Sequence, residues 1–137
     1  MDKREKLLNE LNMCARIALT SYKEFKGHVG NPELKEELDR ERNFYERLLE
    51  ESKKLLRDDI PKNSMSCFQK MGMRMKLFFN DDDCTVADML LEGTLMGFVN
   101  VNKALNRLGK TEDEVVTLAR ETLEEFKTSF NNLARFL

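Results

Sequence analysis

Residues 111–137 of this 137-residue chain read TEDEVVTLARETLEEFKTSFNNLARFL. Apolar side chains recur in this stretch at steps of three and four residues, which is the spacing of one face of an α-helix. They are Val116, Ala119, Leu123, Phe126, Phe130, Leu133 and Leu137. Thr111 and Glu114 have the Ser/Thr-x-x-Glu spacing in which two side chains satisfy free backbone N–H groups at a helix start. The stretch therefore predicts an amphipathic helix over residues 112–137.

Two further segments at the other end of the chain have the same spacing. Residues 2–26 carry an apolar stripe made of Leu8, Leu11, Ala15, Ala18, Tyr22 and Phe25. Residues 32–57 carry a second stripe made of Leu34, Leu38, Glu41, Tyr45, Leu48, Ser52 and Leu55. Asn31 is a suitable N-cap for the second helix, and Pro32 suits its first position because no N–H is missed there.

A third helix is predicted over residues 86–108. Thr85 is its predicted N-cap, Asp88 takes the position that completes a capping box, and Gly109 ends the helix. Between the second and third helices, residues 64–79 are predicted to form a short helix within a long crossover.

Four amphipathic helices bury their apolar stripes when they pack together. Short loops join the first helix to the second and the third helix to the one over 112–137. No sustained alternation of apolar and polar residues indicates a strand. The sequence therefore predicts an all-α four-helix bundle of two antiparallel hairpins joined by the crossover, as a single domain over residues 1–137.

This order of hairpin, crossover and hairpin resembles the ferritin-like class of four-helix bundles. The segment 87–97, ADMLLEGTLMG, followed by Lys103-Ala104-Leu105-Asn106, resembles the third helix of small Firmicutes bundle proteins of unassigned activity. The resemblance covers most of the chain and implies a ferritin-like bundle. It implies no particular activity.

Composition and charge exclude several classes of partner. The chain has 23 Lys and Arg residues against 25 Asp and Glu residues, a net charge of −2 without a basic cluster, so neither nucleic acid nor an anionic membrane is expected as a partner. No apolar run has the length of a membrane span. Cys14, Cys67 and Cys84 are odd in number and widely spaced, and the first residues are charged. We therefore expect a cytoplasmic protein.

A ferritin-like metal pair takes one Glu from each of two helices and a Glu-x-x-His motif from each of the other two. The single histidine, His28, lies in a glycine-flanked loop. We therefore expect a solvated His28, no conventional metal site and no cofactor. An unconventional carboxylate site using Glu41, Glu121 and Glu124 is the alternative.

Glu41 interrupts the apolar stripe of the second helix between Leu38 and Tyr45. An unpaired buried carboxylate is costly. We therefore expect a slight rotation of the helix that turns Phe44 inward and brings Glu41 to solvent. A buried Glu41 paired with an Arg or a Tyr is the alternative.

Two segments near the crossover have unusual compositions. Residues 80–83, Asn-Asp-Asp-Asp, are predicted to stabilise the start of the third helix, because they lack the glycine and the closing Glu of an EF-hand loop. Residues 71–75, Met-Gly-Met-Arg-Met, favour core packing by Met71 and Met75. A contact surface for a partner and Cu(I) binding are the alternatives for these methionines.

The third helix has two features that indicate contacts. Leu95 and Val99 fall within an arc of polar residues, where two apolar side chains are expected to be covered. Gly93 and Gly97, one turn apart, leave a notch that lets another backbone approach. The crossover helix and a second molecule are the two candidates to cover these surfaces.

No set of residues in the sequence assembles a catalytic, metal or phosphate-binding site. We therefore expect a non-catalytic bundle that acts by self-association or by binding another protein. The interface candidates are Gly93, Leu95, Gly97, Val99, Met71 and Met75. The alternatives are a ferritin-like metal-binding or oxidase protein, and a carrier of a small apolar molecule in the bundle core beside the two glycines.

Overall fold

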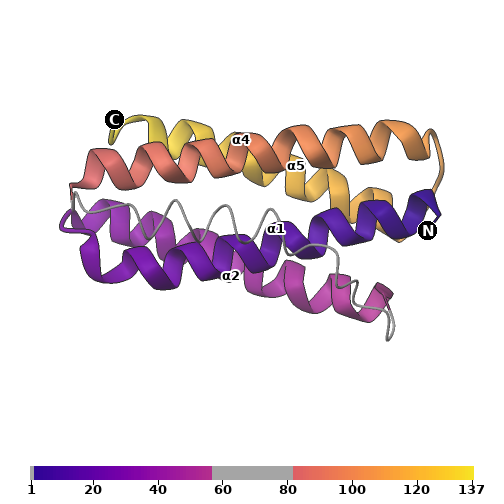
Figure 1. The fold of residues 1–137 in the computed structure, drawn as a ribbon, viewed down its shortest axis with the longest axis horizontal. Helices are drawn as coiled ribbons and strands as arrows, with labels where there is room; N and C mark the ends of the chain where they lie inside the picture. Colours follow the sequence, from indigo (N-terminus) through magenta and orange to yellow (C-terminus); the bar gives the residue numbers. More distant parts are fainter. Residues whose placement is uncertain (1, 57–81) are drawn as a thin grey trace.

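The computed structural model describes residues 2–56 and 82–137, and within these ranges it is helical and contains no strand (Figure 1). The helices are α1 (Lys3–Phe25), α2 (Pro32–Leu56), α4 (Asp83–Leu108) and α5 (Glu114–Ala134), with a 3-10 turn η1 (Lys26–His28) after α1. The four long helices pack against one another, so the prediction of an all-α four-helix protein is confirmed.

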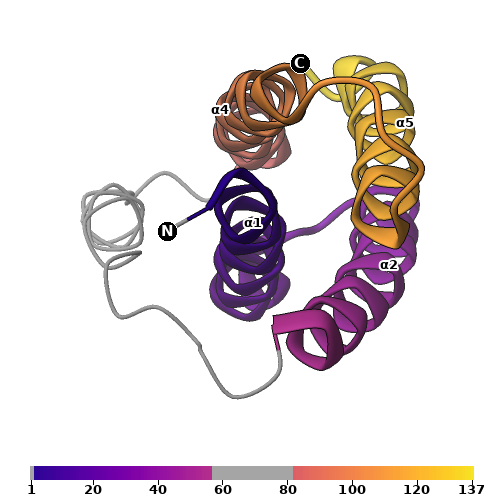
Figure 2. The ribbon, with the colours of Figure 1, turned by 90° about the vertical axis from the view of Figure 1, so that its right-hand side faces the viewer.

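Two hairpins lie side by side in the bundle. Viewed along the bundle, α1 lies next to α4, and α2 lies next to α5 (Figure 2). The Asp83 carboxylate at the start of α4 accepts hydrogen bonds from the backbone N–H groups of Gly30 and Asn31 in the α1–α2 loop, at 2.9 and 3.1 Å. At the other end of the bundle, Arg4 of α1 donates to Asp113 before α5 at 2.9 Å. Neighbouring helices are therefore antiparallel.

Aspartates, and not the predicted threonines, begin the last two helices. Asp82 is the N-cap of α4, and its Oδ1 accepts from the backbone N–H and the hydroxyl of Thr85, both at 2.6 Å. Asp113 is the N-cap of α5 and accepts from the N–H of Val115 at 3.0 Å. The predicted caps Thr85 and Thr111 were wrong, because a carboxylate both accepts these N–H groups and interacts favourably with the helix dipole.

Other boundaries agree with the sequence. Asn31 accepts from the backbone N–H two residues further on, Pro32 opens α2, and Gly109 ends α4 with a φ of +81°, a conformation that favours glycine. The C-terminal prediction was wrong by one turn. Because α5 ends at Ala134, Leu137 lies 60% exposed instead of continuing the apolar stripe.

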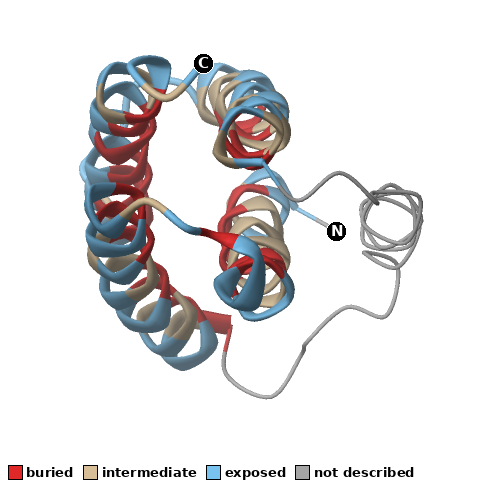
Figure 3. Cartoon of the chain, turned by 90° about the vertical axis from the view of Figure 1, so that its left-hand side faces the viewer, coloured by how far each residue is buried: buried red, intermediate tan, exposed pale blue. Residues whose placement is uncertain are grey.

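The apolar core lies where the stripes of the helices face each other (Figure 3). The stripes predicted for the first two helices are confirmed, with Ala18 and Leu55 only partly buried at their margins. The largest side chain that is almost completely buried is Phe126 of α5, which is 1% exposed. The predicted crossover helix 64–79, with Met71 and Met75, lies outside the described residues.

The contact between Asp83 and the α1–α2 loop gives a first testable expectation. Replacing Asp83 with alanine removes the acceptor of two loop N–H groups, so the free energy of unfolding should fall by about 1 kcal/mol. Urea unfolding followed by circular dichroism measures it. Asp88→Ala, at an exposed position of the same helix, serves as the control and should cost less than about 0.5 kcal/mol. Equal losses for the two variants would contradict the expectation.

Candidate functional site

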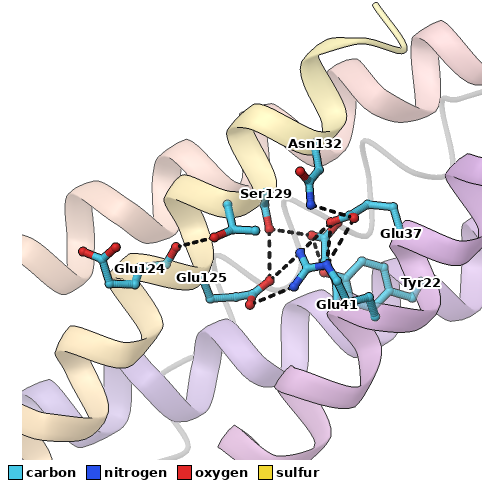
Figure 4. A network of polar contacts seen from close by, with 9 residues as sticks. Tyr22, Glu37, Glu41, Glu124, Glu125, Ser129 and Asn132 are labelled. Atoms are coloured by element: carbon cyan, nitrogen blue, oxygen red, sulfur yellow. Dashed lines mark hydrogen bonds and ion pairs between the residues drawn. The ribbon is translucent and has the colours of Figure 1, made fainter.

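A cluster of polar side chains lies within the bundle, mainly between α2 and α5 (Figure 4). We call it the core polar cluster. It consists of Tyr22 from α1, Glu37, Arg40 and Glu41 from α2, and Glu125, Ser129 and Asn132 from α5. Three carboxylates therefore lie in a cluster with one guanidinium, which bonds two of them, and this is an uncommon composition for a bundle interior.

Glu41 is the most buried acid of the cluster, at 1% exposed. Its Oε1 accepts hydrogen bonds from the Tyr22 hydroxyl at 3.1 Å and from the Ser129 hydroxyl at 2.9 Å. The expectation that Glu41 reaches solvent was wrong, because hydroxyl donors on two facing helices compensate its burial. The alternative of a buried Glu41 paired with a tyrosine is confirmed. Phe44 is half-buried and lies edge-on against Tyr45, with ring centroids 5.3 Å apart.

Arg40 joins the other two carboxylates of the cluster. Its Nε donates to both carboxylate oxygens of Glu37 at 3.1 Å, and its Nη1 donates to Glu125 at 3.0 Å. Asn132 adds a donor to Glu37 at 2.9 Å. Sequence reasoning missed these residues. The available signal was the spacing: Glu37 precedes Glu41 by one turn, which puts both acids on the inner side of α2.

The pKa of Glu41 is raised to about 8. The main cause is burial, which removes water from the carboxylate, and the next is the nearby Glu37 carboxyl group. The second oxygen of Glu41, Oε2, is buried and accepts no hydrogen bond. A proton on this oxygen makes it a donor toward Glu37, and with a pKa of about 8 Glu41 keeps this proton at neutral pH.

The three acids of the alternative metal site do not meet. Glu41 lies in the core, while Glu121 and Glu124 are exposed on α5, and Glu124 pairs with Lys127 at 3.1 Å. Among residues 2–56 and 82–137, no group of three or more His, Cys, Asp or Glu side chains is placed to hold a metal ion. His28 is exposed in η1, in agreement with its predicted position in a loop.

A second feature is a pocket of about 60 Å³ between α1 and α4. Tyr22, Tyr45 and Phe126 contribute aromatic rings to its wall, and Met13 and Met96 are among the aliphatic residues that complete it. The Tyr45 ring lies between the other two, with centroid distances of 6.0 Å to Tyr22 and 6.4 Å to Phe126. The pocket is mostly apolar.

Glu10 is the acidic residue in the wall of this pocket. Its Oε2 atom is buried and has no hydrogen-bond partner. Burial also raises the pKa of the Glu10 carboxyl group above its usual range. Sequence reasoning missed Glu10, because nothing in its local sequence indicates that a neighbouring helix covers it.

The two glycines of α4 face this pocket and not an outer surface. Gly97 is buried, and a Cβ atom there would lie 3.1 Å from Cζ of Phe126 and 3.3 Å from Sγ of Cys14. The notch predicted at Gly97 is therefore filled from within the chain. Gly93 is half-buried in the wall of the same pocket.

The opposite side of α4 is exposed. Leu95 is 54% and Val99 is 39% exposed, and both belong to the few large hydrophobic side chains that are exposed among the described residues. We call the surface around them the outer face of α4. It also contains Asp88, Glu92, Lys103 and Asn106, all exposed. The predicted arc is thus observed, with Leu95 and Val99 exposed on it.

Helix α4 is also the most apolar of the described helices by composition. It is the one helix among them that is long and apolar enough to cross a membrane, a weak criterion that core helices also satisfy. Only 22% of its most apolar 18-residue window is buried.

No family model matches the chain, and neither the curated proteins nor the solved structures compared with it contain a match.

Proposed function

We propose that this chain is a non-catalytic helical bundle that acts by self-association through the outer face of α4. The observation that carries the proposal is the exposure of Leu95 and Val99 at the middle of a long, apolar helix, of which only 22% of the most apolar 18-residue window is buried. Apolar surface in such a position is stabilised when a partner covers it. The order of antiparallel helices also supports our proposal of a ferritin-like fold.

The charges on α4 favour a second copy of this chain as the partner. Acidic Asp88 and Glu92 lie toward its start, and basic Lys103 and Arg107 lie toward its end. When two α4 helices pair antiparallel about a two-fold axis between residues 97 and 98, and so between Leu95 and Val99, each acidic end meets a basic end. Equal spacing about the axis puts Glu92 opposite Lys103 of the partner. In a two-fold contact each of these charge pairs occurs twice.

The oligomeric state in solution tests this proposal. We expect the full chain to dimerise, and Leu95→Lys should weaken dimerisation by at least tenfold, because a charge replaces an apolar side chain at the centre of the contact. Sedimentation equilibrium over a range of protein concentrations measures the dissociation constant. Leu137→Lys is the matched control, because Leu137 is equally large and 60% exposed but lies beyond α5.

A charge exchange tests the antiparallel pairing itself. Lys103→Glu places like charges opposite each other and should weaken the dimer, and the added change Glu92→Lys should restore it. A monomer at every concentration, or a dimer that Leu95→Lys leaves intact, would rule out this contact. Binding of the wild-type chain to lipid vesicles, lost in Leu95→Lys, would reassign the face to a membrane surface.

A further inference from the structure

We infer that the pocket between α1 and α4 is a binding site for a small molecule with an apolar body and a cationic amine head, and that Glu10 receives the head. This inference goes beyond self-association. It rests on the pocket wall and on a carboxylate oxygen that no group among residues 2–56 and 82–137 satisfies.

The apolar body is expected where the wall is aromatic. The rings of Tyr22, Tyr45 and Phe126 line the pocket, and Gly93 belongs to its α4 wall. A mostly apolar wall with few polar groups is typical of small-molecule sites. At about 60 Å³ the enclosed part suits a short alkyl chain, with the rest of the molecule toward the opening.

We expect a cationic head on the ligand because of Glu10. Its Oε2 is buried in the pocket wall without a hydrogen-bond donor, and such a group is stabilised by any donor that reaches it. An ammonium group supplies both a donor and the opposite charge, whereas an anionic head would be repelled. The direction of the Glu10 pKa, raised by burial alone, agrees with a carboxylate that lacks a donor inside the protein.

Two hydroxyl donors in the pocket wall are already in use. The Thr94 hydroxyl donates to the carbonyl of Leu90 at 2.7 Å, and the Tyr22 hydroxyl donates to Glu41. Both groups line the pocket but are directed to other acceptors. A ligand amine therefore does not compete with these hydroxyls for Glu10.

The site is independent of the proposed dimer contact. Successive residues of a helix are 100° apart, so Gly93 and Gly97 lie on the side of α4 opposite to Leu95 and Val99. Loss of dimerisation in Leu95→Lys and loss of ligand binding are thus separate results, and failure of one leaves the other standing.

The test titrates the full-length, ¹⁵N-labelled chain with three probes of similar shape near neutral pH: benzylamine, benzyl alcohol and benzoate. Changes in amide chemical shift locate and quantify binding. We expect shifts at residues lining the pocket, an affinity for benzylamine about tenfold above that for benzyl alcohol, and still weaker binding of benzoate.

Two substitutions separate the head from the body of the ligand. Glu10→Gln should reduce the affinity for benzylamine to that for benzyl alcohol and leave the alcohol unchanged. Ala18→Leu puts a larger side chain into the pocket and should weaken the binding of both probes. Glu24→Gln, at an exposed position of α1, is the control and should change the affinity for neither probe.

Three results would overturn the inference. The first is chemical shift changes away from the pocket, and the second is equal affinities for benzylamine and benzyl alcohol. The third is an equal loss of affinity for both probes in Glu10→Gln. Since Glu10→Gln keeps the side-chain shape, it is expected to fold even if Ala18→Leu does not, and the comparison of the two probes then decides alone.

Discussion

Arg40→Met is expected to lower the free energy of unfolding by about 3 kcal/mol near neutral pH. The guanidinium is the cation that Glu37 and Glu125 share, and these two side chains are only 8% and 9% exposed. Removing it leaves two nearly buried carboxylates without their charged partner, beside a third at Glu41. We place the expected loss of stability at the low end of the range for removing one partner of a buried ion pair. The reason is that Arg40 itself is 39% exposed and partly screened by water.

Arg42→Met is the matched control for this prediction. Arg42 belongs to the same helix and is 36% exposed, but its partners Asp39 and Glu46 are 58% and 59% exposed. Its loss should cost less than about 1 kcal/mol. Urea unfolding of both variants at about pH 7 measures the difference. Equal effects of the two substitutions would show that the cluster does not depend on its arginine.

The helices could be predicted because their signals are local. Stripes of apolar residues, Asn31 before Pro32, and Gly109 after α4 each act within one or two turns of the chain, and all are observed. The errors at Thr85 and Thr111 have the same origin. Several residues near each helix start can accept a free N–H group, and the local sequence alone does not rank an aspartate above a threonine two or three residues away.

The core polar cluster could not be predicted because its bonds join distant parts of the chain. Arg40 and Glu125 are 85 residues apart in sequence, and Glu41 and Ser129 are 88 apart. Each residue taken alone fits an exposed position on a helix, so the cost of burying Glu41 favoured exposure. Only the packing of α2 on α5 brings enough donors to one place, and periodicity does not specify which residues of two helices lie at the same height.

The same argument applies to the two sides of α4. The sequence placed Gly93, Leu95, Gly97 and Val99 together as interface candidates, because all four are unusual on a helix of a soluble bundle. The packing separates them. The Phe126 ring of α5 packs against α4 at Gly97, while Leu95 and Val99 lie on the outer face. One helix thus offers a pocket wall and a contact surface, and each has its own test.

Glu41→Gln is expected to make the protein more stable than the wild type above about pH 8. The pKa of Glu41 is raised from about 4.5 to about 8 in the fold, so the folded state keeps a proton that the unfolded chain has released. The contribution of the protonated group to the free energy of unfolding is complete below about pH 4.5. It is lost as the pH rises toward about 8. The free energy of unfolding should fall by up to about 1.4 kcal/mol per pH unit within this window.

Glutamine reproduces the protonated state at every pH. Its oxygen still accepts from Tyr22 and Ser129, and its amide N–H replaces the protonated Oε2 as the donor toward Glu37. The stability difference between variant and wild type should therefore be small near pH 4.5, grow to roughly 5 kcal/mol in favour of glutamine by about pH 8, and change little above that pH. Urea unfolding at several pH values measures this difference, with Glu124→Gln at an exposed position of α5 as the control. Parallel pH profiles for Glu41→Gln and the wild type would mean that Glu41 is ionised in the folded protein throughout, and that Arg40 and the two hydroxyl donors alone are enough to stabilise its charge.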